Sequence, residues 1–267
     1  MLSAYINGVG LLGPGLIDWS SSQRILKDKQ AYEKQATLLP LPNTLPAAER
    51  RRSGALVRLT LATGLEAVAG AQLDAALIKC VYTSSGGDGQ NCHEICQTLA
   101  SEDRLISPTR FHNSVHNAAT GYWGIATGAM LPISALCAHD ASFSAGLLEA
   151  LCQVVTDNTT ILLIASDAPY PQPLHGVRPI SDAFGISLVL APIASQHSLA
   201  KIEVSLTSEM ADKLKNPELE TLRLSVPAAR SLPLLTALST LQQDKQPKRV
   251  ILDYFNHVRI GLDISAC

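Results

Sequence analysis

The stretch of sequence that decides the fold is residues 106–150, ISPTRFHNSVHNAATGYWGIATGAMLPISALCAHDASFSAGLLEA. Its pattern predicts a loop, a helix punctuated by glycines, a short apolar strand and a sharp turn into a second helix over Ala141–Val155. We expect Ala138, His139 and Asp140 to build that turn, at the buried end of the strand. The turn is therefore the first candidate for a functional site.

Composition narrows the class of protein. The 267 residues suit one large α/β domain, or one domain with a subsidiary lobe. The chain is 46% hydrophobic and 16% charged, which favours an extensive core and leaves room for a buried subunit interface. The net charge of -2 gives no electrostatic reason to expect a nucleic acid or an anionic membrane as partner.

The first residues, MLSAYINGVGLLGPG, lack both the basic region and the long apolar run of a signal peptide. No stretch reaches the roughly 18 apolar residues that a membrane-spanning helix needs. We therefore expect a cytoplasmic protein without a membrane span.

The cysteines and histidines give little support for a metal site. The segment Cys92-His93-Glu94-Ile95-Cys96 superficially suggests one, but no second pair with ligand spacing follows it. His112 and His116 lie four residues apart and could share a helix face, although no carboxylate joins them at the spacing of a zinc protease motif. We expect no metal and no cofactor.

The remaining pattern alternates strands and helices. Strands are expected at Ala4–Leu12, Leu77–Thr83, Thr160–Ala165, Ile186–Ala191, Lys201–Thr207, Arg249–Phe255 and Val258–Ile264; helices are expected at Ala48–Leu73, Cys92–Ala100 and Leu232–Gln242; residues 13–47 are expected to be irregular. Elements of these lengths predict a layered α/β fold whose mixed sheet is covered on both faces.

The order of motifs resembles the N-terminal half of a β-ketoacyl synthase. The opening AYINGVGLLGPG is similar to the first strand and glycine-rich turn of that family, and Ser84-Ser85-Gly86-Gly87 is similar to its next turn. In that family a loop and a helix precede the strand that leads to the nucleophile. This chain has a similar pattern in Ile106-Ser107-Pro108 followed by Asn117, Gly121 and Gly128–Pro132. Asp182–Leu190 is similar to the strand that closes the family's N-terminal half.

The resemblance implies a thiolase-like layered fold. Residues 1–192 would form the N-terminal half, and residues 193–267 would form a shortened C-terminal lobe packed on the same sheet. In active family members a cysteine lies at the start of the helix after the nucleophile strand, where the helix dipole lowers its pKa. They also carry two catalytic histidines in the C-terminal half.

This chain departs from both catalytic features. Counting forward from Pro132 puts Asp140 at the nucleophile position, counting back from Gly146 puts Ala138 there, and Cys137 fits only if the segment is remodelled. We interpret Cys137 as a buried thiol at the strand end. Asp140 is expected to cap the following helix. After Pro192 only His197 and His257 are present, and neither lies in a family motif.

Within the superfamily, a subunit with the fold but without the cysteine is a chain length factor. HNSVHNAATGYWGIATG and LCAHDASFSAGLLEA resemble the compact type that accompanies bacterial aryl polyene synthases. The resemblance implies a non-catalytic subunit that forms a heterodimer with a β-ketoacyl synthase, shapes its acyl pocket in polyene biosynthesis, and meets acyl carrier protein through the complex. The residues expected at that interface or pocket are Phe111, His112, Ser114, Val115, His116, Asn117, Tyr122, Trp123 and Phe143.

Two other functions stay open at this point. Cys137 with His139 or His112 could serve an independent acyltransferase or thioesterase, because a thiol–imidazole pair suffices for acyl transfer. On an extended strand, however, Cys137 and His139 would face opposite sides. A purely structural partner without a substrate pocket is the third hypothesis. Trp123 could equally fill the protein's own core.

Overall fold

The computed structural model describes residues 2–267 and contains strands and helices in regular alternation. In chain order they are β1 (Leu2–Leu12), α1 (Trp19–Leu26), α2 (Ala47–Arg52), α3 (Ala55–Gly70), η1 (Ala75–Leu77), β2 (Lys79–Thr83), α4 (Gly89–Ala100), α5 (Pro108–His112), α6 (Ala118–Thr127), β3 (Ile133–Leu136), η2 (His139–Ala141), α7 (Ser142–Asp157), β4 (Ile161–Asp167), α8 (Leu174–Val177), β5 (Phe184–Ala191), β6 (Ala200–Thr207), α9 (Pro217–Ser225), η3 (Pro227–Ser231), α10 (Leu232–Asp244), β7 (Lys248–Phe255) and β8 (Val258–Ser265).

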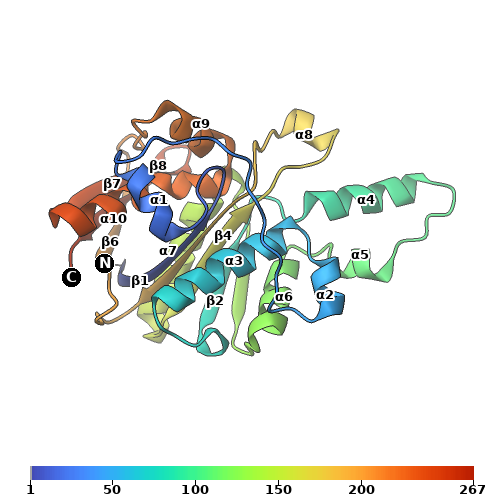
Figure 1. Ribbon diagram of the computed structural model, residues 1–267, viewed down its shortest axis with the longest axis horizontal. Helices are drawn as coiled ribbons and strands as arrows, with labels where there is room; N and C mark the ends of the chain where they lie inside the picture. Colours follow the sequence, from blue (N-terminus) through green and yellow to red (C-terminus); the bar gives the residue numbers. More distant parts are fainter. Residues whose placement is uncertain (1) are drawn as a thin grey trace.

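The strands form one mixed sheet in the order β3-β2-β4-β5-β1-β6-β8-β7. β2 pairs parallel with β3 and β4, whereas the other neighbouring strands pair antiparallel. Helices cover both faces of its N-terminal part (Figure 1). The predicted layered α/β architecture is confirmed. The division of the chain at residue 192 stays a prediction.

β1 lies between two parts of the sheet, β3-β2-β4-β5 on one side and β6-β8-β7 on the other. Its first half pairs with β6 from Leu2 to Ile6, and its second half pairs with β5 from Tyr5 to Leu12. The register with β5 shifts between Ile6 and Gly8. Such an irregularity bends a strand, so one strand can belong to both parts of the sheet.

The glycines of β1 allow α3 to lie directly on the strand. A Cβ atom at Gly8 would lie 2.0 Å from the carbonyl oxygen of Ala67, and one at Gly10 would lie 1.9 Å from that of Thr63. No side chain fits at these two positions without moving the helix. The glycine spacing of NGVGLLG is therefore a packing requirement between helix and strand.

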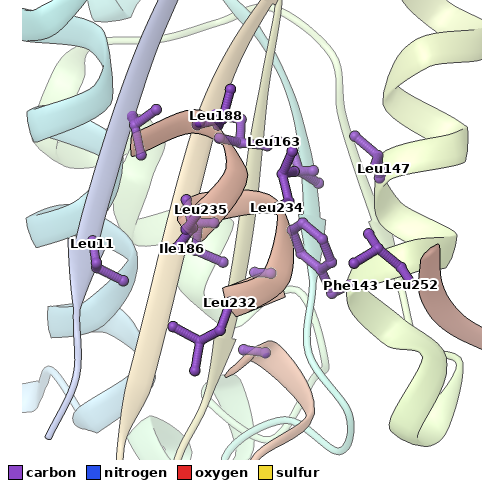
Figure 2. Packing of buried hydrophobic residues seen from close by; sticks show 14 of the residues in the cluster. Leu11, Phe143, Leu147, Leu163, Ile186, Leu188, Leu232, Leu234, Leu235 and Leu252 are labelled. Carbon is purple, nitrogen blue, oxygen red and sulfur yellow. The ribbon is translucent and has the colours of Figure 1, made fainter. Parts of the chain in front are cut away.

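The main core lies between the sheet and α7, η3 and α10. Figure 2 shows leucines and isoleucines from β1, β4 and β5 facing Phe143 and Leu147 of α7. Leu232, Leu234 and Leu235 enter the same core from the C-terminal part of the chain, as does Leu252 of β7. Apolar residues at three-to-four spacing thus put one face of α7 wholly inside the protein.

The predicted boundaries need two corrections in the first quarter of the chain. Residues 13–47 are not irregular throughout, because α1 begins after Asp18, whose carboxylate accepts a hydrogen bond from the Ser21 amide at 2.6 Å. The single helix expected over Ala48–Leu73 is two helices, α2 and α3, separated by Ser53 and Gly54.

Candidate functional site at the elbow between β3 and α7

The elbow is a strained turn at the end of β3. His139 has a φ of +52°, in the left-handed region that residues other than glycine seldom adopt. The Ser142 hydroxyl holds this shape, since it accepts a hydrogen bond from the Ala138 amide at 3.0 Å and donates one to the His139 carbonyl at 2.7 Å. One 3₁₀ turn follows, and α7 then begins at Ser142. His139 therefore occupies the apex of the turn.

Asp140 holds an ion pair at the elbow. Its Oδ1 accepts a hydrogen bond from Arg178 Nη2 at 3.0 Å, and its Oδ2 accepts one from Arg230 Nη2 at 3.1 Å. The N-terminus of α7 has no side-chain cap. The predicted capping role of Asp140 is therefore wrong. Because its two oxygens point to arginines from distant parts of the chain, this carboxylate connects the elbow to α8 and η3 instead.

The ion pairs extend from Asp140 into the C-terminal part. Arg230 Nη1 lies 3.8 Å from Asp253 Oδ2, and that oxygen also accepts a hydrogen bond from Arg223 Nη1 at 2.5 Å. Arg223 is 4% exposed and also donates to both oxygens of Glu220, at 2.8 and 2.7 Å. The hydrogen bond from Arg223 lowers the pKa of Glu220, as expected for a paired carboxylate.

The imidazole of His139 is part of the same cluster. Arg178 Nη1 lies 2.5 Å from His139 Nε2, and because a guanidinium group only donates, the ring nitrogen is the acceptor in this contact. The other ring nitrogen, Nδ1, lies 3.4 Å from Asp140 Oδ1. His139 is thus engaged with Arg178 and Asp140.

Cys137 lies one residue beyond β3 and is exposed. The prediction of a buried strand-end thiol is wrong, because β3 is the last strand of the sheet and is itself only partly buried. The thiol donates a hydrogen bond to the Ser85 carbonyl at 3.2 Å. Among the hydrogen bonds found in residues 2–267, none joins this thiol to an imidazole.

Asp167 is a buried carboxylate that connects two segments near the elbow. It accepts hydrogen bonds from the amides of Ser85 and Ala228, both at 2.8 Å, and so connects the turn after β2 to η3. Burial raises the pKa of Asp167, and the hydrogen bonds from Ser85 act against that shift. The Ser84 carbonyl of the same turn lies 3.1 Å from His116 Nε2.

The residues predicted for an interface fall into two groups. Six lie on α5 or between α5 and α6: Phe111, His112, Ser114, Val115, His116 and Asn117. Phe111 and Val115 expose 68% and 52% of their surface, although both side chains are apolar. α4 and α5 project from the body of the protein as an arm (Figure 1). These six residues therefore belong to one accessible region.

The three other predicted residues are buried in this chain's own core. Trp123 is fully buried, and a Cβ atom at Gly64 of α3 would lie 2.5 Å from its ring. Phe143 points into the main core, and Tyr122 donates a hydrogen bond from its hydroxyl to Asn113 Oδ1 at 3.2 Å. They offer no surface to a partner in the isolated chain, because large aromatic side chains fill cores as readily as interfaces. Tyr122 nevertheless lines a small cavity together with His116, and a place for these side chains in an acyl pocket stays a prediction.

The sequence reasoning missed the arginines and two of the acids. Arg178, Arg223, Arg230, Asp167 and Asp253 all lie outside the motifs that carried the resemblance. Asp253 interrupts an apolar strand, VILDYF, and this was the available signal. Arg178 and Arg230 gave none, because Asp140 lies 38 and 90 residues away from them in sequence. For Arg223 the available signal was Glu220, three residues earlier on the same helix.

Residues 2–267 contain no group of three or more His, Cys, Asp or Glu side chains placed to hold a metal ion. Within the same residues, no helix has the length and apolar character to cross a membrane.

One comparison with known proteins identifies a family for this chain. Residues 17–247 match the family model described as β-ketoacyl synthase, N-terminal domain. No curated protein sequence matched the chain.

Solved structures of the same fold cover nearly the whole chain. The chain is similar to one in the complex of the ketosynthase ApeO with its chain length factor ApeC from Xenorhabdus doucetiae, with 22% identity, a TM-score of 0.73, and coverage of 98% of this chain and 100% of that one. The ishigamide ketosynthase/chain length factor gives 14% identity, a TM-score of 0.73 and coverage of 99% of both chains. The type II ketosynthase complex AntDE:AntF includes an acyl-carrier protein. It gives 12% identity, a TM-score of 0.77 and coverage of 99% of both chains. These structures confirm the predicted thiolase-like fold.

Proposed function

Because the chain belongs to the family of β-ketoacyl synthase N-terminal domains, we propose that it is a non-catalytic chain length factor that pairs with an active β-ketoacyl synthase. The partner would supply the nucleophilic cysteine and the catalytic histidines. This chain would complete the fold of the pair and shape the acyl pocket. The assembled pair would receive its acyl groups from acyl carrier protein, in a cytoplasmic pathway of the aryl polyene type.

The observation that carries this proposal is the chemistry of the elbow. A condensing subunit needs a nucleophile there, and the nucleophile needs an acid/base partner. At the elbow of this chain, the polar groups of His139 and Asp140 are engaged with arginines. The Cys137 thiol is hydrogen-bonded to a backbone carbonyl, which cannot accept its proton for catalysis. The elbow keeps its backbone shape while its side chains form ion pairs.

The partner surface is proposed on the arm and on β3. β3 pairs with β2 on one side and lies at the end of the sheet. An open strand edge offers unpaired backbone groups that another strand can bind. Large apolar side chains are exposed on the arm, on α6 and just before β3: Leu105 (79%), Phe111 (68%), Val115 (52%), Ile125 (50%) and Met130 (93%). Exposed apolar groups in this number favour a protein interface.

Co-expression with a co-encoded ketosynthase tests the pairing. We expect a stable heterodimer by size exclusion and multi-angle light scattering. Phe111→Asp should weaken it, because an apolar contact becomes a buried charge. Leu38→Asp is the matched control, since Leu38 is 83% exposed outside this surface. Heterodimers equally stable with both variants, or no association with any co-encoded ketosynthase, would contradict the proposal.

The alternative of an independent Cys137-dependent acyltransferase or thioesterase is tested on the chain expressed alone. Intact mass spectrometry after incubation with acyl thioesters would detect acylation of the isolated chain. We expect none. Acylation that disappears in Cys137→Ala would favour the alternative over the chain length factor.

A further inference from the structure

A cavity of about 640 Å³ lies between β1, α3 and the long segment that joins α1 to α2. Most of its lining is apolar, and a volume of this size is within the range of small-molecule sites in proteins. The lining residues used below are Leu11, Ile17, Asp18, Leu38, Ala62 and Glu66.

The segment between α1 and α2 is fixed against the protein where it borders the cavity. The Thr37 hydroxyl donates a hydrogen bond to the Ala183 carbonyl at 2.7 Å, and Leu39 packs against a buried apolar cluster. Side chains alternate along an extended chain, so Leu38, between these two anchors, lines the cavity and is 83% exposed. This wall is therefore in place before a ligand binds.

Glu66 brings a carboxylate from α3 to the cavity. Its Oε2 accepts a hydrogen bond from the Leu11 amide at 2.8 Å, and its Oε1 accepts one from the Trp19 amide at 2.7 Å. Glu66 is only partly buried and belongs to the lining. Each oxygen of a carboxylate can accept a second hydrogen bond, so both oxygens can still accept one from a ligand in the cavity.

The two charged side chains of the lining are both acidic. Asp18 directly precedes Trp19, and its charge adds to the effect of burial in raising the pKa of Glu66. Within residues 2–267, neither Asp18 nor Glu66 forms an ion pair. The basic residues of the surrounding elements that lie outside the lining include Arg24, Lys34 and Arg58. The cavity therefore presents negative charge to a ligand and supplies no positive charge of its own.

We propose that this cavity binds a small organic cation, a protonated primary amine with a short alkyl chain. The ammonium group donates hydrogen bonds to Glu66 and lies close to Asp18. The alkyl chain lies on Leu11, Ile17 and Leu38. The site goes beyond the proposed pairing with a ketosynthase, because none of its residues lies on the arm or on β3.

Release of a proton should accompany binding. Burial raises the pKa of Glu66 to about 7, so roughly half of the free protein carries this proton at pH 7. An ammonium group beside the carboxylate favours its ionised form. Affinity should therefore rise about tenfold between pH 6 and pH 8. The amine itself stays protonated over this range, because its pKa is about 10.

The test is isothermal titration of the full chain, or of its complex with the partner, with butylamine, butanol and butyrate at constant ionic strength. Butylamine should bind more tightly than either of the others, and more tightly at pH 8 than at pH 6. Glu66→Gln should lower the affinity for butylamine about tenfold at pH 8 and abolish its pH dependence. Ala62→Leu should weaken binding at both pH values, because it fills the cavity without changing its charge. Glu102→Gln, at an exposed carboxylate after α4, is the matched control.

Butanol that binds as tightly as butylamine would overturn the proposal, because the carboxylates would then have no role. Equal affinity for butylamine at pH 6 and pH 8 would overturn it as well, as would binding that Ala62→Leu leaves unchanged. The pH comparison uses the parent protein, so a Glu66→Gln variant that fails to fold would not hide the result. None of these outcomes affects the proposed pairing with a ketosynthase, which is tested by size exclusion.

Discussion

At the scale of single residues, the backbone shape of the elbow and the contacts of its charged side chains have different causes. The positive φ of His139 is maintained by the two hydrogen bonds of the Ser142 hydroxyl, and neither bond depends on a catalytic side chain. The polar groups of Asp140 bind arginines from α8 and η3. Backbone and serine contacts are thus sufficient to hold this strained turn.

Replacing Asp140 should destabilise the protein. In Asp140→Ala, Arg178 and Arg230 lose a shared, partly exposed counterion, and we expect a loss of about 1–2 kcal/mol in the free energy of unfolding. Urea unfolding of the assembled complex measures it. Asp157→Ala, at the other end of α7, is the matched control, because its exposed pair with Lys79 is screened by solvent and should contribute less to stability. Equal losses in the two variants would contradict the role given to Asp140.

Glu66 should make stability depend on pH. It accepts hydrogen bonds from the amides of Leu11 and Trp19, at 2.8 and 2.7 Å, yet burial raises its pKa to about 7 from an ordinary value near 4.5. The folded state therefore binds this proton more tightly than the unfolded state. The resulting stabilisation is complete below about pH 4.5 and is lost as the pH rises through 7.

The measurement is thermal melting from pH 5 to 8. The parent should lose stability across this range relative to Glu66→Gln, whose side chain does not titrate. Glu102→Gln, at an exposed carboxylate, should follow the parent at every pH. A constant difference between the parent and Glu66→Gln would show that Glu66 is ionised throughout.

Sequence reasoning at this scale failed where partners were distant. The capping role expected for Asp140 considered only its own helix, whereas its arginines lie 38 and 90 residues away. Cys137 was expected to be buried because its neighbours in sequence are apolar, but the open edge of β3 exposes it. A tryptophan such as Trp123 is common both at interfaces and in cores. Only its burial and its packing against α3 show that it is a core residue here.

At the scale of elements, β1 and α3 pack so closely that a single methyl group at their contact tests the fold. Gly10→Ala should destabilise by about 3 kcal/mol, because its Cβ would lie 1.9 Å from the Thr63 carbonyl oxygen and the helix must move. Gly70→Ala is the matched control on the same pair of elements, since its Cβ would meet its nearest atom at 3.8 Å. Chemical unfolding compares them, and similar values for both variants would contradict this packing.

Most of the strands were predictable because their apolar runs are strong. The predicted strands at Thr160–Ala165 and Ile186–Ala191 are β4 and β5, both buried throughout. α1 was not predicted, because its eight residues include three serines and its start depends on Asp18 and Glu66. The break between α2 and α3 was missed as well. A Cβ at Gly54 would lie 2.5 Å from the Asp88 carboxylate, which is a contact made only in the folded chain.

At the scale of the whole molecule, two surfaces differ in character. Charged pairs lie across the C-terminal strands, where Arg249 of β7 meets Asp263 of β8 and Glu209 after β6, and Lys201 meets Glu203 within β6. The arm and the edge of β3 instead expose apolar side chains such as Phe111 and Met130. The charged surface of the C-terminal strands is readily solvated, whereas the apolar surface of the arm and β3 favours contact with another protein.

The isolated chain should therefore self-associate, and a ketosynthase partner should prevent it. Light scattering at increasing concentration measures the effect for the chain alone and for the co-expressed pair. We expect growth of large species only in the isolated chain, because the pair covers the apolar surface. A monomer that stays monodisperse at high concentration would weigh against an unfilled interface.

The most direct test of the central claim is a condensation assay on purified heterodimers in which the cysteines are replaced one at a time. We expect that Cys137→Ala leaves the rate of condensation unchanged, whereas replacing the nucleophilic cysteine of the ketosynthase partner abolishes it. Loss of condensation with Cys137→Ala in a complex that remains assembled would contradict the account and make this chain a catalytic subunit.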